Sequence, residues 1–268
     1  MRSLPGKTAI ITGAASGIGR ALAHRLAREN MRLVLADVDR RRLRQVASEL
    51  PGALAVPTDV SRISEVESLA VRAYRRFGAV HLLCNNAGVA EYGAVWEVPL
   101  ARWRRVVGVN LWGAIHGCLV FLPRMIAQGG AAHVVNTASM AGLVTPPLAG
   151  AYSATKHAVV AISEALVQDL ALRRARIGVS VLCPGWVATR LLESASGADP
   201  VLRSLVAHGI SPETVAERTV RAVRAGEFYV LTHPDMAPAV RRRADDILAG
   251  RAPAALPFKP RRSRAASR

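Results

Sequence analysis

Three residues in the second half of the chain, Ser139, Tyr152 and Lys156, could perform acid–base chemistry. Tyr152 and Lys156 are four residues apart, a spacing that places both side chains on one face of a helix. A free phenol has a pKa of about 10, but a cation beside it favours the phenolate and brings this proton within reach of neutral-pH chemistry. The hydroxyl of Ser139 could then orient a substrate oxygen against the phenol. The Tyr-x-x-x-Lys spacing alone is weak evidence, and it gains weight from a nucleotide-binding pattern in the same chain.

That nucleotide-binding pattern lies at the start of the chain. Residues 7–11 form a short apolar run with β-branched side chains, which predicts a buried first strand. The run leads into the glycine-rich segment T-G-A-A-S-G-I-G at residues 12–19 and then into a helical stretch. In such a turn, backbone N–H groups and the positive end of the helix face a pyrophosphate. We expect Gly13 to permit the tight turn, Gly17 to allow close approach of a cofactor, and Gly19 to allow close packing of helix on strand.

The choice between NAD and NADP depends on Asp37, which ends a second predicted strand at residues 31–36. An acidic residue about 20 positions after the glycine turn holds a ribose 2′-hydroxyl and repels a 2′-phosphate, so the sequence favours NAD over NADP. Two alternatives remain open. Asp37 and Asp39 both precede a predicted helix, so Asp37 could merely cap it. Three arginines also lie close enough to meet a phosphate instead: Arg40, Arg41 and Arg42.

Taken together, these motifs resemble those of the short-chain dehydrogenase/reductase family in its single-domain form. The matching groups are Thr12 to Gly19 (TGxxxGxG), Asn85 to Gly88 (NNAG), the catalytic set Asn110, Ser139, Tyr152 and Lys156, and Pro184 to Thr189 (PG-x-V-x-T). The match spans about residues 6–235 in the expected order. So many spaced motifs in one chain make coincidence negligible.

The resemblance implies a role for each matching residue. Tyr152 would be the general base when an alcohol is oxidised and the acid when a ketone is reduced. Lys156 would lower its pKa and bind the nicotinamide ribose, Ser139 would hydrogen-bond the substrate oxygen, and Asn110 would anchor a water linking the lysine to solvent. Thr189 would meet the nicotinamide carboxamide. The implied dinucleotide site comprises Gly13, Ser16, Gly17, Ile18, Gly19, Asp37, Asp59, Val60, Asn86, Ala87, Gly88, Tyr152, Lys156, Pro184, Gly185, Val187 and Thr189.

Strands and helices are predicted to alternate along the chain, which favours a parallel sheet covered on both faces. The expected fold is a Rossmann-type, doubly wound α/β domain of about seven strands over residues 1–250. Strands are expected near residues 7–12, 31–36, 53–57, 80–85, 131–137, 177–183 and 227–232. Helices are expected within residues 17–29, 40–50, 62–77, 101–127, 152–174 and 211–225. We expect a substrate lid near residues 189–211 and a basic, proline-broken, mobile tail at residues 251–268.

Composition limits the alternatives. No stretch reaches 18 uninterrupted apolar residues, so no membrane-spanning helix is predicted. The first strand begins by about Lys7, which leaves no room for a secretory segment. The cysteines and the histidines His116, His133 and His157 lack metal-ligand spacing, so no metal site is predicted. Buried reduced thiols suit a cytoplasmic protein; the three cysteines are Cys84, Cys118 and Cys183.

The net charge of +17 invites a nucleic-acid interpretation. All basic residues except Lys7, Lys156 and Lys259 are arginines, and they are spread over the whole chain. This indicates a compositional bias and argues against one nucleic-acid-binding face. The concentrated part is residues 241–268, with nine basic residues against Asp245 and Asp246. Contact of this segment with anionic lipid, nucleic acid or an acidic partner stays open.

Apolar residues surround the motifs that would hold the nicotinamide and the lid, which predicts a hydrophobic substrate. These residues are Val89, Tyr92, Met140, Leu143, Val144, Trp186, Leu191, Leu192, Leu202, Leu205 and Val206. Ordinary core packing would account for about half of them. We expect NAD-dependent oxidation of a hydrophobic secondary alcohol to a ketone by a homotetramer or homodimer. The alternatives are an NADP-dependent ketone reductase and a non-catalytic dinucleotide-binding sensor or scaffold.

Overall fold

Seven parallel strands form one sheet in the computed structural model, which describes residues 1–193, 195 and 200–253 of the chain. The strands are β1 (Thr8–Thr12), β2 (Arg32–Asp37), β3 (Leu54–Pro57), β4 (Leu82–Asn85), β5 (Ala132–Thr137), β6 (Ile177–Cys183) and β7 (Tyr229–Leu231). Their order in the sheet is β3-β2-β1-β4-β5-β6-β7. The chain thus builds outward from β1 in one direction and from β4 in the other. This confirms the predicted Rossmann-type sheet and places its topological switch point between β1 and β4.

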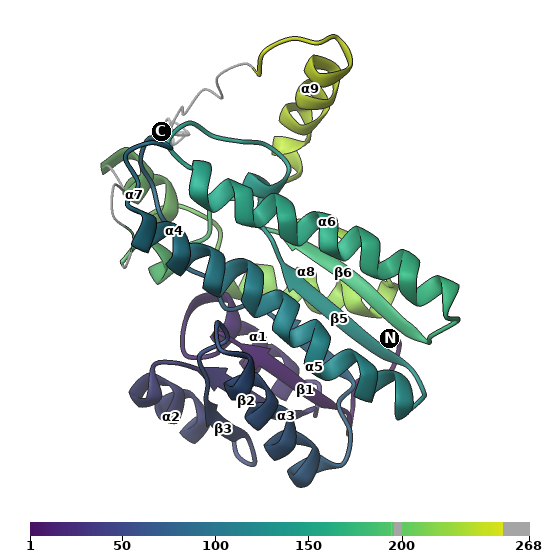
Figure 1. Ribbon diagram of the computed structural model, residues 1–268. Helices are drawn as coiled ribbons and strands as arrows, with labels where there is room; N and C mark the ends of the chain where they lie inside the picture. The colour runs from purple at the N-terminus through teal and green to yellow at the C-terminus, as the bar shows by residue number, and fades with distance from the viewer. Residues whose placement is uncertain (194, 196–199, 254–268) are drawn as a thin grey trace, which may run out of the picture.

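Helices cover both faces of this sheet (Figure 1). They are α1 (Gly17–Ala27), α2 (Arg40–Ser48), α3 (Ile63–Phe77), α4 (Leu100–Val107), α5 (Gly113–Ala127), α6 (Gly150–Leu172), α7 (Pro200–Ala207), α8 (Pro212–Ala225) and α9 (Ala237–Leu248). One buried cluster joins the sheet to α1, α2 and α8, and a second joins the opposite face to α3, α5 and α6. Within β1, Ile10 belongs to the second cluster while Ala9 and Ile11 belong to the first. The two-residue alternation of a strand therefore feeds both cores from a continuous apolar run.

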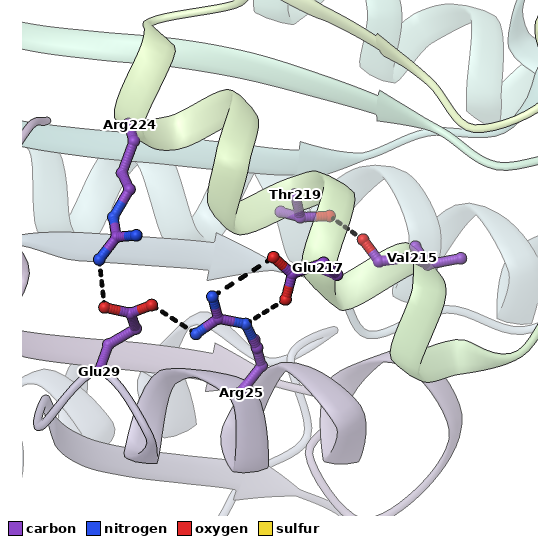
Figure 2. Close-up of polar contacts among 6 residues, drawn as sticks. All are labelled: Arg25, Glu29, Val215, Glu217, Thr219 and Arg224. Atoms are coloured by element: carbon purple, nitrogen blue, oxygen red, sulfur yellow. Dashed lines mark hydrogen bonds and ion pairs between the residues drawn. The ribbon is translucent and has the colours of Figure 1, made fainter.

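A partly buried network of charged side chains connects α1 to α8, on the face of the sheet that α1, α2 and α8 cover (Figure 2). Arg25 on α1 contacts Glu217 on α8 and Glu29 just after α1, while Arg224 on α8 contacts the same Glu29. The side chain of Glu29 is only 12% exposed, and each of its carboxylate oxygens contacts one of these two guanidinium groups. Ser211 caps the start of α8 by accepting a hydrogen bond from the backbone N–H of Thr214 at 3.1 Å.

The helices α4 and α5 are joined by a π-helical turn at Gly108–Trp112 into one continuous helix that crosses the sheet beside α6 (Figure 1). By length and composition alone, this segment, Leu100–Ala127, is the one helix among the described residues that could cross a membrane, whereas the sequence predicts none. Packing accounts for part of its apolar character, because Phe121 and Met125 are fully buried against the second core cluster, whereas Trp112 and Leu119 are exposed.

All seven predicted strands and six predicted helices are present, with ends within a few residues of the expected ones. Two helices were not predicted. The segment α7 falls inside residues 189–211, and α9 follows the last strand. Residues 194 and 196–199 of the predicted lid, and residues 254–268 of the predicted tail, lie outside the described part of the chain.

Candidate active site

The glycine turn between β1 and α1 is packed too tightly for any other residue at two positions. A Cβ atom on Gly13, whose φ is +67°, would lie 2.8 Å from the Cα atom of Ala87. A Cβ atom on Gly19 would lie 2.0 Å from the carbonyl oxygen of Gly13. Gly17 has a φ of +50° and faces the methyl group of Thr189, with 3.1 Å between that methyl and an added Cβ. The start of α1 thereby lies open to the cleft with its backbone N–H groups uncovered by side chains, which is the cradle that a pyrophosphate needs.

The turn is joined to the loop after β4 through Thr12. The Oγ1 atom of Thr12 accepts hydrogen bonds from the backbone N–H groups of Asn86 at 2.9 Å and Ala87 at 3.0 Å. The side-chain amide of Asn86 donates back to the carbonyl oxygen of Thr12 at 2.9 Å, and its Oδ1 atom accepts from the hydroxyl of Thr137 at 3.3 Å. These bonds connect the ends of β1, β4 and β5 across the switch point.

Asp37 lies at the end of β2, and it does not cap α2. Its Oδ2 atom accepts a hydrogen bond from the backbone N–H of Ala15 at 3.0 Å, inside the glycine turn. The cap of α2 is Asp39, which accepts from the backbone N–H of Arg42 at 3.0 Å and also lies 3.4 Å from the guanidinium of that residue. The capping alternative for Asp37 is therefore excluded. Arg42 lines the same cleft as Asp37, whereas Arg40 and Arg41 do not.

The three residues with acid–base potential meet at the carboxyl ends of β5 and β6. Tyr152 and Lys156 come from the first turns of α6, where both side chains are buried, and Ser139 follows β5. The Nζ atom of Lys156 lies 5.7 Å from the centre of the Tyr152 ring and donates a hydrogen bond to the carbonyl oxygen of Thr137 at 2.8 Å. Ser139 faces the phenol of Tyr152 and donates from its hydroxyl to the carbonyl oxygen of Pro184 at 3.3 Å.

Burial dominates the protonation of this pair. It raises the pKa of the Tyr152 phenol to about 12, and the hydrogen bond with Ser139 acts in the opposite direction. It lowers the pKa of the Lys156 ammonium to about 8. The sequence led us to expect that Lys156 would lower the pKa of Tyr152, and the structure differs because removal of the phenol from water outweighs its neighbours. Tyr152 is therefore a proton donor at neutral pH in this structure.

Asn110 lies behind the reaction centre in the π-helical turn, where its side chain is 97% removed from solvent. Its Oδ1 atom accepts from the backbone N–H of Val89 at 2.8 Å, and its Nδ2 atom donates to the carbonyl oxygen of Val89 at 2.9 Å and to the hydroxyl of Thr155 at 3.1 Å. The side chain thus clamps the loop after β4 onto α6. The added residue of a π-turn aims this side chain inward, a feature common at functional sites.

Nearly all of the predicted site residues line one cleft of about 1320 Å³ along the carboxyl edge of the sheet. They are Gly13, Ser16, Gly17, Ile18, Asp37, Asp59, Val60, Asn86, Ala87, Gly88, Ser139, Tyr152, Lys156, Pro184, Gly185, Val187 and Thr189. Gly19 and Asn110 lie behind its wall and act through packing and hydrogen bonds. The donors of the glycine turn at one end and the Tyr152 region at the other fit an extended dinucleotide.

Several residues that shape the cleft carry no sequence signal. Met236 and Ala239, from the segment after β7, form part of its wall. His233 supports Gly185, since its Nδ1 atom accepts from the backbone N–H of Gly185 at 3.0 Å. Among the described residues no group of three potential metal ligands occurs, and His116, His133 and His157 each hydrogen-bond a nearby protein oxygen.

Comparisons with known proteins agree with this site. The family model for short chain dehydrogenases matches residues 7–199. A 1-deoxy-11-beta-hydroxypentalenate dehydrogenase of Streptomyces exfoliatus is 37% identical over 252 residues, covering 90% of this chain and 88% of that protein. A CLA biosynthesis dehydrogenase/reductase of Lactiplantibacillus plantarum is 32% identical over 277 residues, covering 94% and 97%. A short-chain dehydrogenase/reductase of Burkholderia phymatum, crystallised in complex with NAD, is 41% identical with a TM-score of 0.92, covering 96% of this chain and 99% of that one.

The fold, the cleft and these similarities define a class of enzyme, the NAD(P)-dependent oxidoreductases that act on alcohols. Within that class, the chain belongs to the short-chain dehydrogenase/reductase family.

Proposed function

We propose that this enzyme oxidises a hydrophobic secondary alcohol to a ketone with NAD, and that Tyr152 is its general acid/base. The observation that carries the proposal is the meeting of Ser139, Tyr152 and Lys156 at one end of a cleft whose other end is the glycine turn. When bound, the dinucleotide supplies the hydride acceptor. The Tyr152 oxygen takes the proton of the substrate hydroxyl, and the Ser139 hydroxyl holds the substrate oxygen and stabilises the charge on it.

Lys156 and Asn110 support this chemistry from behind. The ammonium of Lys156 lies between the Tyr152 ring and the end of β5, where it could hold ribose hydroxyls and return a proton. Gly88 keeps the space between them open, because a Cβ there would lie 3.4 Å from the Asn110 Oδ1 atom and 3.6 Å from the Lys156 Nζ atom. We propose that Asn110 holds the walls of this space between Lys156 and Gly88 in position.

The substrate end of the cleft supports a lipophilic ligand. Ala90, Tyr152 and Leu202 belong to an apolar cluster there, together with the half-buried side chains of Trp186 and Val206. Further apolar residues line the cleft beside them: Val89, Met140, Val144, Leu148, Leu191, Leu205 and Met236. We propose that residues 189–211 form the substrate lid. One relative is named a 1-deoxy-11-beta-hydroxypentalenate dehydrogenase, and together with the apolar lining this supports our proposal of a terpenoid, steroid or polyketide-like substrate.

The cofactor proposed is NAD. Asp37 faces the glycine turn with its Oδ1 atom occupied by the backbone N–H of Asp39 at 2.9 Å, and its carboxylate would accept a ribose 2′-hydroxyl and repel a 2′-phosphate. The second candidate is NADP-dependent ketone reduction, which two observations favour. Arg42 lines the cleft beside Asp37, and the raised pKa of Tyr152 suits a proton donor.

We also propose a homotetramer or homodimer in the cytoplasm. Trp112 and Leu119 on the α4–α5 helix, and Val167 on α6, are more than one-third exposed although they are large and apolar. Such a surface suits an interface between copies of the chain. The three cysteines are free thiols, which suits a reducing compartment.

The test is a screen of lipophilic secondary alcohols and ketones with both cofactors, followed at the absorbance of the reduced nicotinamide. Tyr152→Phe, which keeps the ring and removes the proton, should lower turnover on the order of 10²-fold or more while NAD binding persists. Near-normal turnover by this variant would refute the assignment. A large excess of NADP-linked reduction would favour the second candidate.

A further inference from the structure

A second phenol, that of Tyr92, lies in the substrate end of the cleft. Its ring centre is 6.3 Å from that of Tyr152 and the two planes are tilted by 30°. Tyr92 lines the cleft and packs on the apolar cluster of Ala90, Leu192 and Leu202. The two phenols therefore face the same ligand space from different elements, one from the loop after β4 and the other from α6.

The loop holds Tyr92 in place on both sides. Its neighbour Glu91 is 3% exposed and forms an ion pair with Arg102 of α4 at 3.3 Å. Its other neighbour, Gly93, donates its backbone N–H to the carbonyl oxygen of Leu148 at 2.7 Å and has a φ of +148°. A buried carboxylate and a backbone conformation that favours glycine are costly features to place beside one residue. Here they fix the position of the Tyr92 side chain relative to Tyr152.

The hydroxyl of Tyr92 has no hydrogen-bond partner within the described part of the chain, and the side chain is partly buried in the apolar cluster. Burial raises the pKa of this phenol, so the group stays neutral and able to donate throughout the working pH range. Trp186 belongs to the same apolar cluster as Tyr92, and Met140 and Val144 line the same cleft. Tyrosine hydroxyls in apolar surroundings normally form a hydrogen bond, so this hydroxyl is available to a ligand in the cleft.

From this geometry, and resting on the function proposed above, we infer that Tyr92 is a specificity-determining residue that donates a hydrogen bond to a second oxygen of the substrate. The substrate class is a lipophilic alcohol or ketone that carries a further carbonyl or hydroxyl besides the reacting one. Tyr152 and Ser139 meet the reacting oxygen, and Tyr92 orients the ring that bears it. No group is transferred at Tyr92, so its contribution lies in binding and orientation.

The test compares two alcohols, 2-decalol and a hydroxydecalone whose ketone is on the second ring, with NAD and the full-length enzyme. Tyr92→Phe should lower the ratio of kcat/KM for the hydroxydecalone to that for 2-decalol by about 10-fold, the effect of one hydrogen bond to a ligand. The change should appear mainly in KM for the hydroxydecalone. The variant loses no hydrogen bond within the described protein, so its Tm should match that of the wild type.

The matched control is Tyr74→Phe, which removes a phenol oxygen on α3 that lies away from the cleft. This control should leave the ratio unchanged. An unchanged ratio in Tyr92→Phe, or an equal loss on both alcohols, would overturn the assignment of Tyr92 while leaving the proposed oxidation intact. Failure of the wild-type enzyme to oxidise either alcohol would count against both the proposed function and the role of Tyr92.

Discussion

Tyr152 and Lys156 carry opposite pKa changes from one cause, the loss of water around both side chains. The phenol, with a pKa of about 12, holds its proton at neutral pH, and the ammonium, with a pKa of about 8, is close to losing one. A base with a raised pKa is present only as a small ionised fraction, which increases about tenfold with each unit of pH. The free enzyme is thus prepared for ketone reduction near neutrality and for alcohol oxidation in alkali.

The pH dependence should reveal this difference between the two directions. We expect kcat/KM for alcohol oxidation to rise steadily between pH 7 and pH 10, because it requires the phenolate of Tyr152. Ketone reduction requires the protonated phenol, which is present below a pKa of about 12, so its kcat/KM should not rise over the same interval. Steady-state rates in both directions measure this. Oxidation that stays constant down to pH 6 would mean that another group lowers the pKa of Tyr152 well below its value here.

Cofactor choice depends on one carboxylate. Asp37→Ala removes the group placed to accept a ribose 2′-hydroxyl and leaves Arg42 in the same cleft. We expect kcat/KM with NAD to fall by about 10-fold or more and kcat/KM with NADP to rise, as for the loss of a charged hydrogen-bond partner. Asp169→Asn on the exposed side of α6 is the matched control and should change neither value. A wild type that already prefers NADP would show that Arg42 decides the choice.

At this scale the sequence predicts residues whose motifs are local. The glycine turn and the Tyr152–Lys156 pair lie within short segments, so their spacing reveals them. The hydrogen bonds of Asn110 are different, because its partners are distant in the sequence. Val89 lies 21 positions before Asn110, and Thr155 lies 45 positions after it. The direction of the Tyr152 pKa was also wrong, since burial is a property of the packed fold and no pairwise spacing contains it.

Among the elements, the strands were predictable because both faces of the sheet are buried, and buried parallel strands are short apolar runs between polar turns. The two helices that were not predicted, α7 and α9, have no such buried apolar run between polar turns. The helix α9 is rich in charge and leaves Ile247 and Leu248 exposed, so its sequence has no continuous apolar face. The π-helical turn at Asn110 was also not predicted, because one inserted residue leaves the helical periodicity on either side almost unchanged.

The charge network between α1 and α8 makes a prediction about stability. Glu29→Gln leaves Arg224 without its carboxylate and removes one of two partners of the partly buried Arg25. The free energy of unfolding should fall by about 1–2 kcal/mol, more than for exposed ion pairs. The matched control is Glu213→Gln, at an exposed position in the first turn of α8. It should lower the free energy of unfolding by only a few tenths of this amount. Denaturant unfolding at constant slope measures both, and equal effects would contradict the assignment.

At the scale of the whole molecule, the described residues that line the cleft all precede residue 240. We expect deletion of residues 254–268 to leave kcat and KM within about twofold of the wild type, because the residues before them already supply both ends of the cleft. Steady-state kinetics of the truncated enzyme, with the circular-dichroism spectrum as a folding control, measure this. A loss of 10-fold or more would place this basic segment in the working enzyme.

The sheet order has a consequence for how such an enzyme can diversify. Asp37 ends β2 and Asp59 follows β3 on one side of the switch point, whereas Trp186 and Leu202 follow β6 on the other. Between them, the hydrogen bonds of Thr12, Asn86 and Thr137 brace the centre. The residues at the two ends of the cleft are separated by this centre. The effects of substitutions at the two ends on binding free energy should therefore add. Proteins that evolve from this chain can therefore change their nicotinamide cofactor and the carbon skeleton of their substrate in separate evolutionary steps.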